Sequence, residues 1–335
     1  MSRRPRTGLT LRRTARVSQC LPEPRSDIIE APARRGAAGA FLGRICEVER
    51  GRAMRLMRVL STYLFRSQRL GPGLLTEIEQ AGIPQLELYC ARSHFDYRSP
   101  QAVREFADWI DGHDLCVHSV HAPTSREMGE KRENSTPISV SDLERVRRLD
   151  AVDEVKRGLE LAEVIPYRFL VLHLGAGRET EDPRRMDAAL NSLEHLCVFA
   201  KQRGVTIALE NTFGEYASPA ALRQFVTDTH LRDLRLCFDV GHAHLWEGVG
   251  PAFDAMRDLV VTTHLHDNSG ERDDHLFPYQ GTIHWDAALA ALATAGQELP
   301  LTLEVRETSA EPKPLPAAVS AFERLERAAA ALAQR

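Results

Sequence analysis

Short apolar runs alternate with longer amphipathic segments from residue 58 onward. Near-continuous apolar runs of four to six residues are typical of parallel strands covered on both faces. Eight such runs, rich in Val, Leu, Ile and Phe, cover residues 59–64, 85–89, 115–120, 168–172, 205–209, 234–238, 260–263 and 300–305. The pattern therefore predicts eight strands of a parallel sheet.

The segments between these runs are amphipathic and predict helices. Three of them begin with Pro preceded by Ser99, Asp182 or Ser218, which is the residue order of a helix start. The predicted helices cover residues 72–80, 100–112, 141–164, 183–202, 219–228, 251–257, 286–295 and 316–333. Eight strand–helix units in the 277 residues after Arg58 match the size of a (β/α)8 barrel.

A doubly wound open sheet is the rival architecture. That fold usually carries a glycine-rich phosphate turn after its first strand. Here residues 67–73 read S-Q-R-L-G-P-G, which is not that fingerprint. We therefore predict the α/β class and a single TIM barrel over residues 57–335, with the polar insertion 124–140 as a lid or substrate loop at its catalytic face.

Residues 1–56 form an Arg-rich extension of different composition. Residues 1–58 hold fourteen Arg, no Lys and five acidic side chains, a net charge of +9. The remaining residues hold 29 basic and 42 acidic side chains, a net charge of −13, and all thirteen His. We expect the extension to be disordered or to reflect a misassigned start, with Met54 or Met57 as the natural beginning.

Several classes of protein are excluded by what the sequence lacks. Six scattered Cys without a C-x-x-C pair favour a reducing cytoplasm over a disulfide framework. The chain has no apolar stretch near the roughly 18 to 20 residues of a membrane span. None of its four Lys follows a predicted strand, and P-loop and G-x-S-x-G motifs are absent, so Schiff-base, P-loop and α/β-hydrolase chemistry are not expected.

Ionisable side chains lie at the carboxyl ends of six successive predicted strands. They are His121, His173, Glu210, Asp239, His264 and Glu304. Because the carboxyl ends of barrel strands meet at one face, these side chains should converge where barrel enzymes build their active sites. Converging carboxylates repel one another unless a cation lies among them, and mixed His, Asp and Glu ligands suit Zn²⁺, Mn²⁺, Co²⁺ or Mg²⁺.

We therefore expect one divalent metal ion held by Glu210, Asp239, His264 and Glu304. Five further residues are sufficient for one or two more metal ions: His121, His173, His242, Asp273 and His275. For His118, His244 and His266 the sequence supports a structural role at least as well as a functional one. His94, His113, His195, His230 and His284 lie outside this register and are interpreted as structural or solvated, and Cys116 and Cys237 as core residues.

Together the motifs resemble the xylose-isomerase-like TIM-barrel superfamily. The resemblance rests on V-H-A-P at 120–123, L-E-N-T at 209–212, F-D-V-G-H at 238–242, H-L-H-D-N at 264–268, D-D-H at 273–275, G-T-I-H-W at 281–285 and L-E-V at 303–305. The superfamily includes sugar phosphate isomerases and epimerases and the endonuclease-IV-type AP endonucleases. The resemblance covers nearly all of residues 58–335.

The resemblance implies a metal-dependent isomerase or epimerase of a small sugar, sugar phosphate or related hydroxy-carbonyl compound. In that branch, Glu210, Asp239, His264 and Glu304 match the ligands of one divalent metal ion. The two glutamates move protons through a cis-enediolate, and His242 binds substrate. His121, His173 and Arg306 are further candidates for substrate binding, with Arg272 as an alternative to Arg306. Barrels of this type often form homodimers.

The endonuclease branch implies a different activity, a three-zinc phosphodiesterase acting on abasic DNA. Its additional ligands match His121, His173, His242, Asp273 and His275, so all nine ligands are present. The sugar branch is favoured because a body of charge −13 repels a phosphate backbone and no loop combines Arg, Lys and aromatic residues. One departure from relatives is Y-Q-G at 279–281 where Gly-Glu-Gly is common. A ligand-binding barrel without catalysis is the second alternative.

Overall fold

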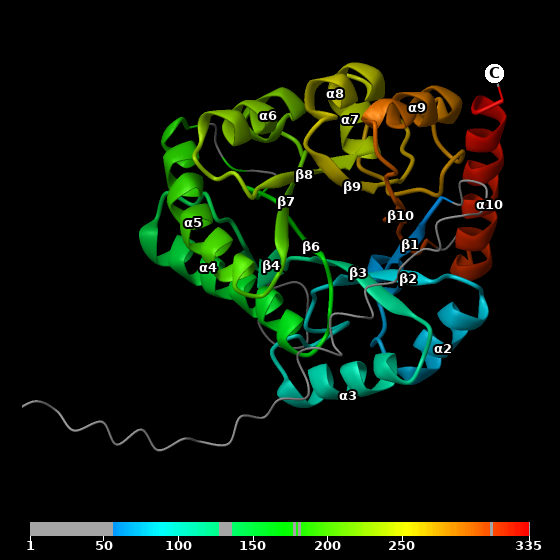
Figure 1. Cartoon of the computed structure of the whole chain (residues 1–335), viewed down its shortest axis with the longest axis horizontal. Helices are drawn as coiled ribbons and strands as arrows, with labels where there is room; N and C mark the ends of the chain where they lie inside the picture. The colour runs from blue at the N-terminus through cyan, green and yellow to red at the C-terminus, as the bar shows by residue number, and fades with distance from the viewer. Residues whose placement is uncertain (1–55, 127–135, 177–178, 180–181, 309–310, 335) are drawn as a thin grey trace, which may run out of the picture. The chain divides into compact units, whose positions relative to one another are not determined.

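A single (β/α)8 barrel makes up the described part of the chain, as the sequence predicts. The computed structural model describes residues 56–126, 136–176, 179, 182–308 and 311–334. Within them, helices form a ring around eight parallel strands (Figure 1). The predicted Arg-rich extension lies outside the described residues except for Leu56.

The eight strands follow one another around the sheet in the order β10-β1-β2-β3-β6-β7-β8-β9. The ring closes between β9 and β10, where Leu265 and Leu303 form an isolated parallel bridge and the Leu265 N–H donates to Thr302 O over 2.8 Å. The strands are β1 (Arg58–Ser61), β2 (Gln85–Tyr89), β3 (Cys116–His121), β6 (Phe169–Leu172), β7 (Thr206–Glu210), β8 (Arg235–Asp239), β9 (Val260–His264) and β10 (Leu301–Leu303). All eight lie within predicted strands or at most one residue beyond them.

The helices that cover the barrel also agree with the amphipathic pattern. Ser99 and Ser218 cap two of them, because their hydroxyls accept the N–H groups of Ala102 and Ala221. The helices are α2 (Pro72–Gln80), α3 (Pro100–Asp111), α4 (Arg145–Glu160), α5 (Arg184–Lys201), α6 (Pro219–Asp228), α7 (Val240–Trp246), α8 (Val249–Met256), α9 (Trp285–Leu292) and α10 (Pro314–Leu332). None of the helices in the described ranges is long and apolar enough to span a bilayer.

Three local features differ from the predicted elements. The first strand ends at Ser61, because Thr62–Phe65 turns into a 3-10 helix. Helix α7 has no predicted counterpart; it begins directly after β8, where the Asp239 carboxylate accepts the N–H of His242. The polar insertion carries a small antiparallel hairpin of β4 (Ser125–Arg126) and β5 (Thr136–Pro137), while its residues 127–135 lie outside the described part.

Most of the apolar core lies between the strands and the ring of helices. Inside the barrel the apolar core is small and consists of Val171, Ala208 and Cys237, with Val261 packed against it. Polar side chains fill much of the rest of the interior, including Glu87, Ser119 and Thr262, all fully buried. Burying a polar group is costly unless a hydrogen bond or an opposite charge compensates it. The polar interior of the barrel therefore depends on specific contacts between these side chains.

His118 is one of these interior groups and does not belong to any of the ligand clusters described below. Its Nε2 lies 3.3 Å from Thr262 Oγ1, and burial lowers the pKa of the imidazole to about 4. In the unfolded chain the pKa is near 6.5. Between pH 6.5 and 4 the unfolded state therefore binds more protons, and stability falls as the pH falls.

We expect wild-type protein to lose about 3 kcal/mol more unfolding free energy than His118→Gln between pH 7 and pH 4, from the size of this pKa shift. Urea unfolding at a series of pH values measures the difference. Parallel pH profiles for the two proteins would show that His118 is not the buried neutral base described here.

Candidate metal centre

Four predicted metal ligands meet at the carboxyl end of the barrel. Glu210, Asp239 and His264 are the last residues of β7, β8 and β9, and Glu304 follows the last residue of β10. Three are fully buried, and Glu304 is 4% exposed. One ligand atom of each lies within 4.8 Å of those of the other three. The structure therefore brings together the four residues that the strand-end pattern selects.

A shift in strand register aligns two of these ligands. Leu236 faces Val260, but Cys237 faces Thr262, so β9 contains one extra residue at this point. Asp239 consequently lies opposite His264 instead of Thr263. Bulges often re-aim side chains next to active sites. The local irregularity is therefore part of what assembles the ligand set.

Buried atoms without partners provide a test of whether these residues fit a metal ion. Glu210 Oε1, Asp239 Oδ2 and His264 Nδ1 are buried and have no hydrogen-bond partner in the described part of the chain. Leaving such groups unsatisfied is costly, and a cation would satisfy all three. Three carboxylates and one imidazole suit Mn²⁺, Zn²⁺, Co²⁺ or Mg²⁺. The residues present therefore fit a divalent metal ion.

A second group of ligands lies beside the first. His242, His266, Asp273 and His275 also bring one ligand atom each within 4.8 Å of one another. The sequence left His266 open, but the structure buries it completely, with Nε2 3.1 Å from Asp239 Oδ1 and 3.7 Å from Asp273 Oδ1. A Cβ at Gly241 would collide with the His266 ring. Gly241 is therefore required for His266 to occupy this position.

The remaining predicted histidines surround Glu210. His173 Nε2 lies 3.1 Å from Glu210 Oε2, and His121 Nε2 lies 3.4 Å from the same oxygen and 3.7 Å from Glu304 Oε1. The Nδ1 atom of His242 is 3.3 Å from Glu210 Oε1. Glu210 thus contacts both groups of ligands, and all nine predicted ligands lie in one connected cluster.

The charges in the cluster are strongly coupled. Burial alone would raise the pKa of Glu210, but the neighbouring His264 and His173 hold it well below the ordinary value. Burial alone would lower the pKa of His264, but Cys237 and the carboxylates of Glu304, Glu87 and Glu210 raise it well above the ordinary value. The same balance between burial and the Glu210 hydrogen bond raises the pKa of His121 to about 9. Protonated imidazoles therefore compensate the carboxylates, and a cation would take the place of these protons because metal ligation needs neutral imidazole.

A separate buried carboxylate organises the loop that carries Asp273 and His275. Asp267 is fully buried and accepts the backbone N–H groups of Asn268, Tyr279 and Ile283 over 2.9 to 3.1 Å. It also accepts the indole N–H of Trp285 over 2.8 Å. These hydrogen bonds tie the H-L-H-D-N segment to the G-T-I-H-W segment, so that each fixes the position of the other.

Arginine candidates for substrate binding lie outside this cluster. The Arg306 N–H donates to His275 O over 2.9 Å, but its guanidinium forms no ion pair within the described residues. Arg272 pairs with Asp274 at 3.3 Å, and its side chain is 79% exposed. The structure thus brings the Arg306 backbone to the centre without placing either guanidinium against a candidate ligand.

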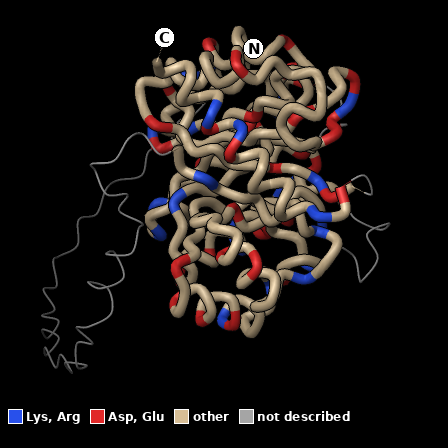
Figure 2. The backbone as a smooth tube through the Cα atoms, turned by 90° about the vertical axis from the view of Figure 1, so that its right-hand side faces the viewer, with Lys and Arg blue, Asp and Glu red and all other residues tan. Residues whose placement is uncertain are grey.

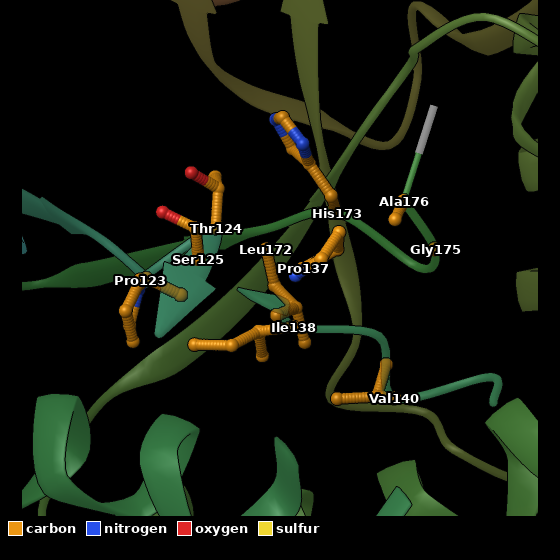
Figure 3. Close-up of a pocket in the computed structure, with 11 residues that line it drawn as sticks. Pro123, Thr124, Ser125, Pro137, Ile138, Val140, Leu172, His173, Gly175 and Ala176 are labelled. Atoms are coloured by element: carbon orange, nitrogen blue, oxygen red, sulfur yellow. The ribbon is translucent and has the colours of Figure 1, made fainter. Parts of the chain in front are cut away.

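A cavity of about 370 Å³ adjoins the centre at His173 (Figure 3). It lies between the ends of β3 and β6 and the hairpin β4–β5. Its wall is mostly apolar, with the hydroxyls of Thr124 and Ser125 and the imidazole of His173 as polar groups. A space of this size beside a ligand cluster is sufficient for a small molecule.

The sequence matches the family described as xylose isomerase-like TIM barrel over residues 75–328. An uncharacterized protein of Sinorhizobium fredii, y4fM, is 26% identical over 209 residues, which cover 57% of this chain and 66% of that protein. The chain thus spans just under two thirds of the length of that relative.

Solved structures share the fold at low sequence identity. A D-tagatose 3-epimerase-like protein has a TM-score of 0.68 and 20% identity, covering 83% of this chain and 99% of that one. L-ribulose 3-epimerase has a TM-score of 0.68 and 16% identity, covering 84% of this chain and 96% of that one. The IOLI protein with a bound zinc atom has a TM-score of 0.62 and 17% identity, covering 81% of this chain and 96% of that one.

Proposed function

Because the chain belongs to the xylose isomerase-like TIM barrel family, we propose that it is a divalent-metal-dependent isomerase or epimerase of a small sugar, sugar phosphate or related hydroxy-carbonyl compound. The observation that carries the proposal is the buried set Glu210, Asp239, His264 and Glu304, whose ligand atoms converge within 4.8 Å. Two similar structures are named as a ketose epimerase or a protein like one, which supports this class of substrate.

A divalent cation held by Glu210, Asp239, His264 and Glu304 would polarise the carbonyl and the neighbouring hydroxyl oxygen of the sugar. Glu210 and Glu304 act as the acid/base pair: one carboxylate removes the proton next to the carbonyl, and the other returns a proton to the cis-enediolate. The rings of His242, His121 and His173 surround Glu210. In this proposal they bind oxygen atoms of the substrate next to that carboxylate. Arg306, in the loop after β10, is a further candidate for substrate binding, because its backbone N–H donates to His275 O at the edge of the cluster.

The same cluster supports a proposal for additional metal ions. His242, Asp273 and His275 would hold a second ion together with His266, which the sequence did not select. His121 would share Glu210 and His264 in a further group, with His173 beside Glu210. The substrate-binding and metal-binding roles of His121, His173 and His242 are therefore alternatives that depend on how many metal ions the protein holds.

The nine converging residues also favour a second candidate function, a three-zinc phosphodiesterase acting on abasic DNA. Charge argues against it: residues 59–335 carry a net charge of −13, and Figure 2 shows acidic and basic positions intermixed along the backbone on one side of the barrel. A phosphate backbone is bound by concentrated positive charge. A ligand-binding barrel without catalysis is a third candidate, and the presence of both Glu210 and Glu304 argues against it.

A side-by-side assay distinguishes these functions. Purified protein is analysed for metal content and incubated with a panel of ketoses, their phosphates and an abasic-site duplex. We expect conversion of at least one sugar in the presence of a divalent metal ion, with the duplex intact. About three zinc ions per chain with strand incision would overturn the proposal in favour of the phosphodiesterase. Stoichiometric metal without turnover of any substrate would overturn it in favour of the binding protein.

Homodimer formation and a cytoplasmic location belong to the same proposal and stay predictions. Size-exclusion chromatography with light scattering measures the first. Homodimer formation would not alter the set of metal ligands, because every residue in that set comes from one chain.

A further inference from the structure

A buried carboxylate on a strand without candidate ligands lies next to the metal centre. Glu87 is in the middle of β2 and is fully buried. The ligand groups described above contain no residue of this strand. Removing a carboxylate from water is unfavourable unless charge or hydrogen bonds compensate it. Its contacts therefore indicate what the residue is for.

Both contacts of Glu87 are made through one oxygen. Glu87 Oε2 accepts the Ser119 hydroxyl over 2.8 Å and lies 3.0 Å from His264 Nε2. The other oxygen, Oε1, is buried without a hydrogen-bond partner in the described part of the chain. Strands β2 and β9 are separated by β10 and β1 in the sheet, so the contact with His264 is made across the barrel interior.

A second register shift supports this arrangement. Leu86 faces Val117, but Glu87 faces Ser119, so the paired strand β3 contains an extra residue at His118. Without the shift Glu87 would face His118. Bulges are uncommon between parallel strands, and this barrel has one at Glu87 and one that aligns Asp239 with His264. Both shifts thus act on the surroundings of the same imidazole.

The two nitrogens of His264 have different environments. Nε2 points to Glu87, whereas Nδ1 lies 3.2 Å from Glu210 Oε2, 3.3 Å from Glu304 Oε2 and 3.8 Å from Asp239 Oδ2. A carboxylate only accepts hydrogen bonds, so the contact with Glu87 requires the proton on Nε2. This tautomer leaves the Nδ1 lone pair free to face the proposed metal ion.

We propose that Glu87 is a positioning residue that fixes the tautomer and ring orientation of His264 for metal binding. The inference rests on the proposed function only through its metal ion, not through the identity of the sugar. A carboxylate behind a ligating histidine increases the donor strength of the ring. Because Zn²⁺ and Mn²⁺ bind imidazole more readily than Mg²⁺ does, Glu87 favours these ions over Mg²⁺.

The variant Glu87→Gln tests this role with little change of shape. We expect the dissociation constant for Zn²⁺, measured by competition with a chromogenic chelator, to rise about 10- to 100-fold. The dissociation constant for Mg²⁺ should change less, so the preference for Zn²⁺ falls. Ser119→Ala removes only the neighbouring contact and should give a smaller loss of Zn²⁺ affinity.

Glu154→Gln is the matched control, because Glu154 is also a buried carboxylate, 3% exposed, that accepts a hydrogen bond from Tyr97 Oη over 2.8 Å. It belongs to none of the ligand groups, so its replacement should alter stability but not metal affinity. Equal Zn²⁺ affinity in wild type and Glu87→Gln would overturn the role of Glu87 and leave the proposed function intact. Wild-type protein that binds no divalent ion would overturn both.

A measurement on the wild type covers the case in which Glu87→Gln does not fold. Long-range ¹H–¹⁵N spectra of the Zn²⁺-loaded protein report which nitrogen of each histidine carries the proton, and comparison with His264→Asn assigns the signal. We expect His264 with the proton on Nε2 and Nδ1 bound to zinc. The opposite tautomer would overturn the proposal.

Discussion

Replacing Glu304 by glutamine is expected to reduce kcat about 10³-fold while the barrel stays folded. Glu304 Oε2 lies 3.3 Å from His264 Nδ1, and Oε1 lies 3.7 Å from His121 Nε2, so the side chain faces both the proposed metal ion and the substrate position. An amide of the same size keeps the packing but cannot take up a proton. Acid–base groups typically contribute 10²- to 10⁴-fold to the rate.

Steady-state kinetics on the sugar identified by the panel measures this effect. Glu307→Gln is the control, because Glu307 lies three residues later in the same loop, is exposed, and contacts Ser67. It should leave kcat unchanged. Circular dichroism and metal content would show that Glu304→Gln is folded. Turnover near the wild-type rate in that variant would contradict the assigned role.

Removing the metal ion with a chelator is expected to abolish turnover and to destabilise the fold. Glu210 and Asp239 are fully buried carboxylates with unpartnered oxygens, which a bound cation would satisfy. A ligand present at about 1,000 times its dissociation constant stabilises the folded state by about 4 kcal/mol. Urea unfolding with and without added Zn²⁺ or Mn²⁺ measures the difference, and adding the ion back should restore both stability and activity.

Glu210→Gln provides the comparison for the metal effect. Glu210 lies within hydrogen-bonding or ion-pairing distance of His173, His264 and His242, so its loss weakens both groups of ligands. The stability of this variant should depend little on added metal. Unfolding curves of wild-type protein that coincide with and without metal would show that the cluster is held by its own protons instead of by a cation.

Much of the fold could be predicted because each barrel strand is covered on both sides. Packing against the helices makes the outward face of each strand apolar, and the ligands stand out as polar residues at the ends of the strands. Glu210, Asp239 and His264 are the last residues of their strands, as the pattern predicts. The match to the family confirms the superfamily to which these motifs pointed.

Other features could not be predicted because they depend on contacts across the barrel. Glu87 is the single charged residue within the run Q-L-E-L-Y, and nothing in that run shows that its partner is His264, 177 residues away. His266 lies in the short segment H-L-H-D-N, whose sequence is consistent with a core role and with a ligand role. Helix α7 has seven residues and begins at a cap supplied by Asp239, so it has too few turns to show a helical period.

The register shifts could not be predicted either, because one extra residue inside a strand gives no separate signal in the sequence. Val260–His264 and Cys116–His121 both read as ordinary strands in sequence. Only the pairing with β8 and β2 reveals the extra residue in each. The strand-end pattern therefore predicts which ligands converge but not how they are aligned.

Hydrogen exchange at the substrate carbon tests the central claim most directly, since the two glutamates are proposed to move a proton next to a metal-polarised carbonyl. Metal-loaded protein is incubated in D₂O with the sugar that it converts, and the recovered product is analysed by NMR and mass spectrometry. The account predicts deuterium on the carbon adjacent to the carbonyl, in a reaction that stops on chelation and in Glu304→Gln. Conversion without incorporation of deuterium, or conversion that persists in metal-free protein, would contradict it.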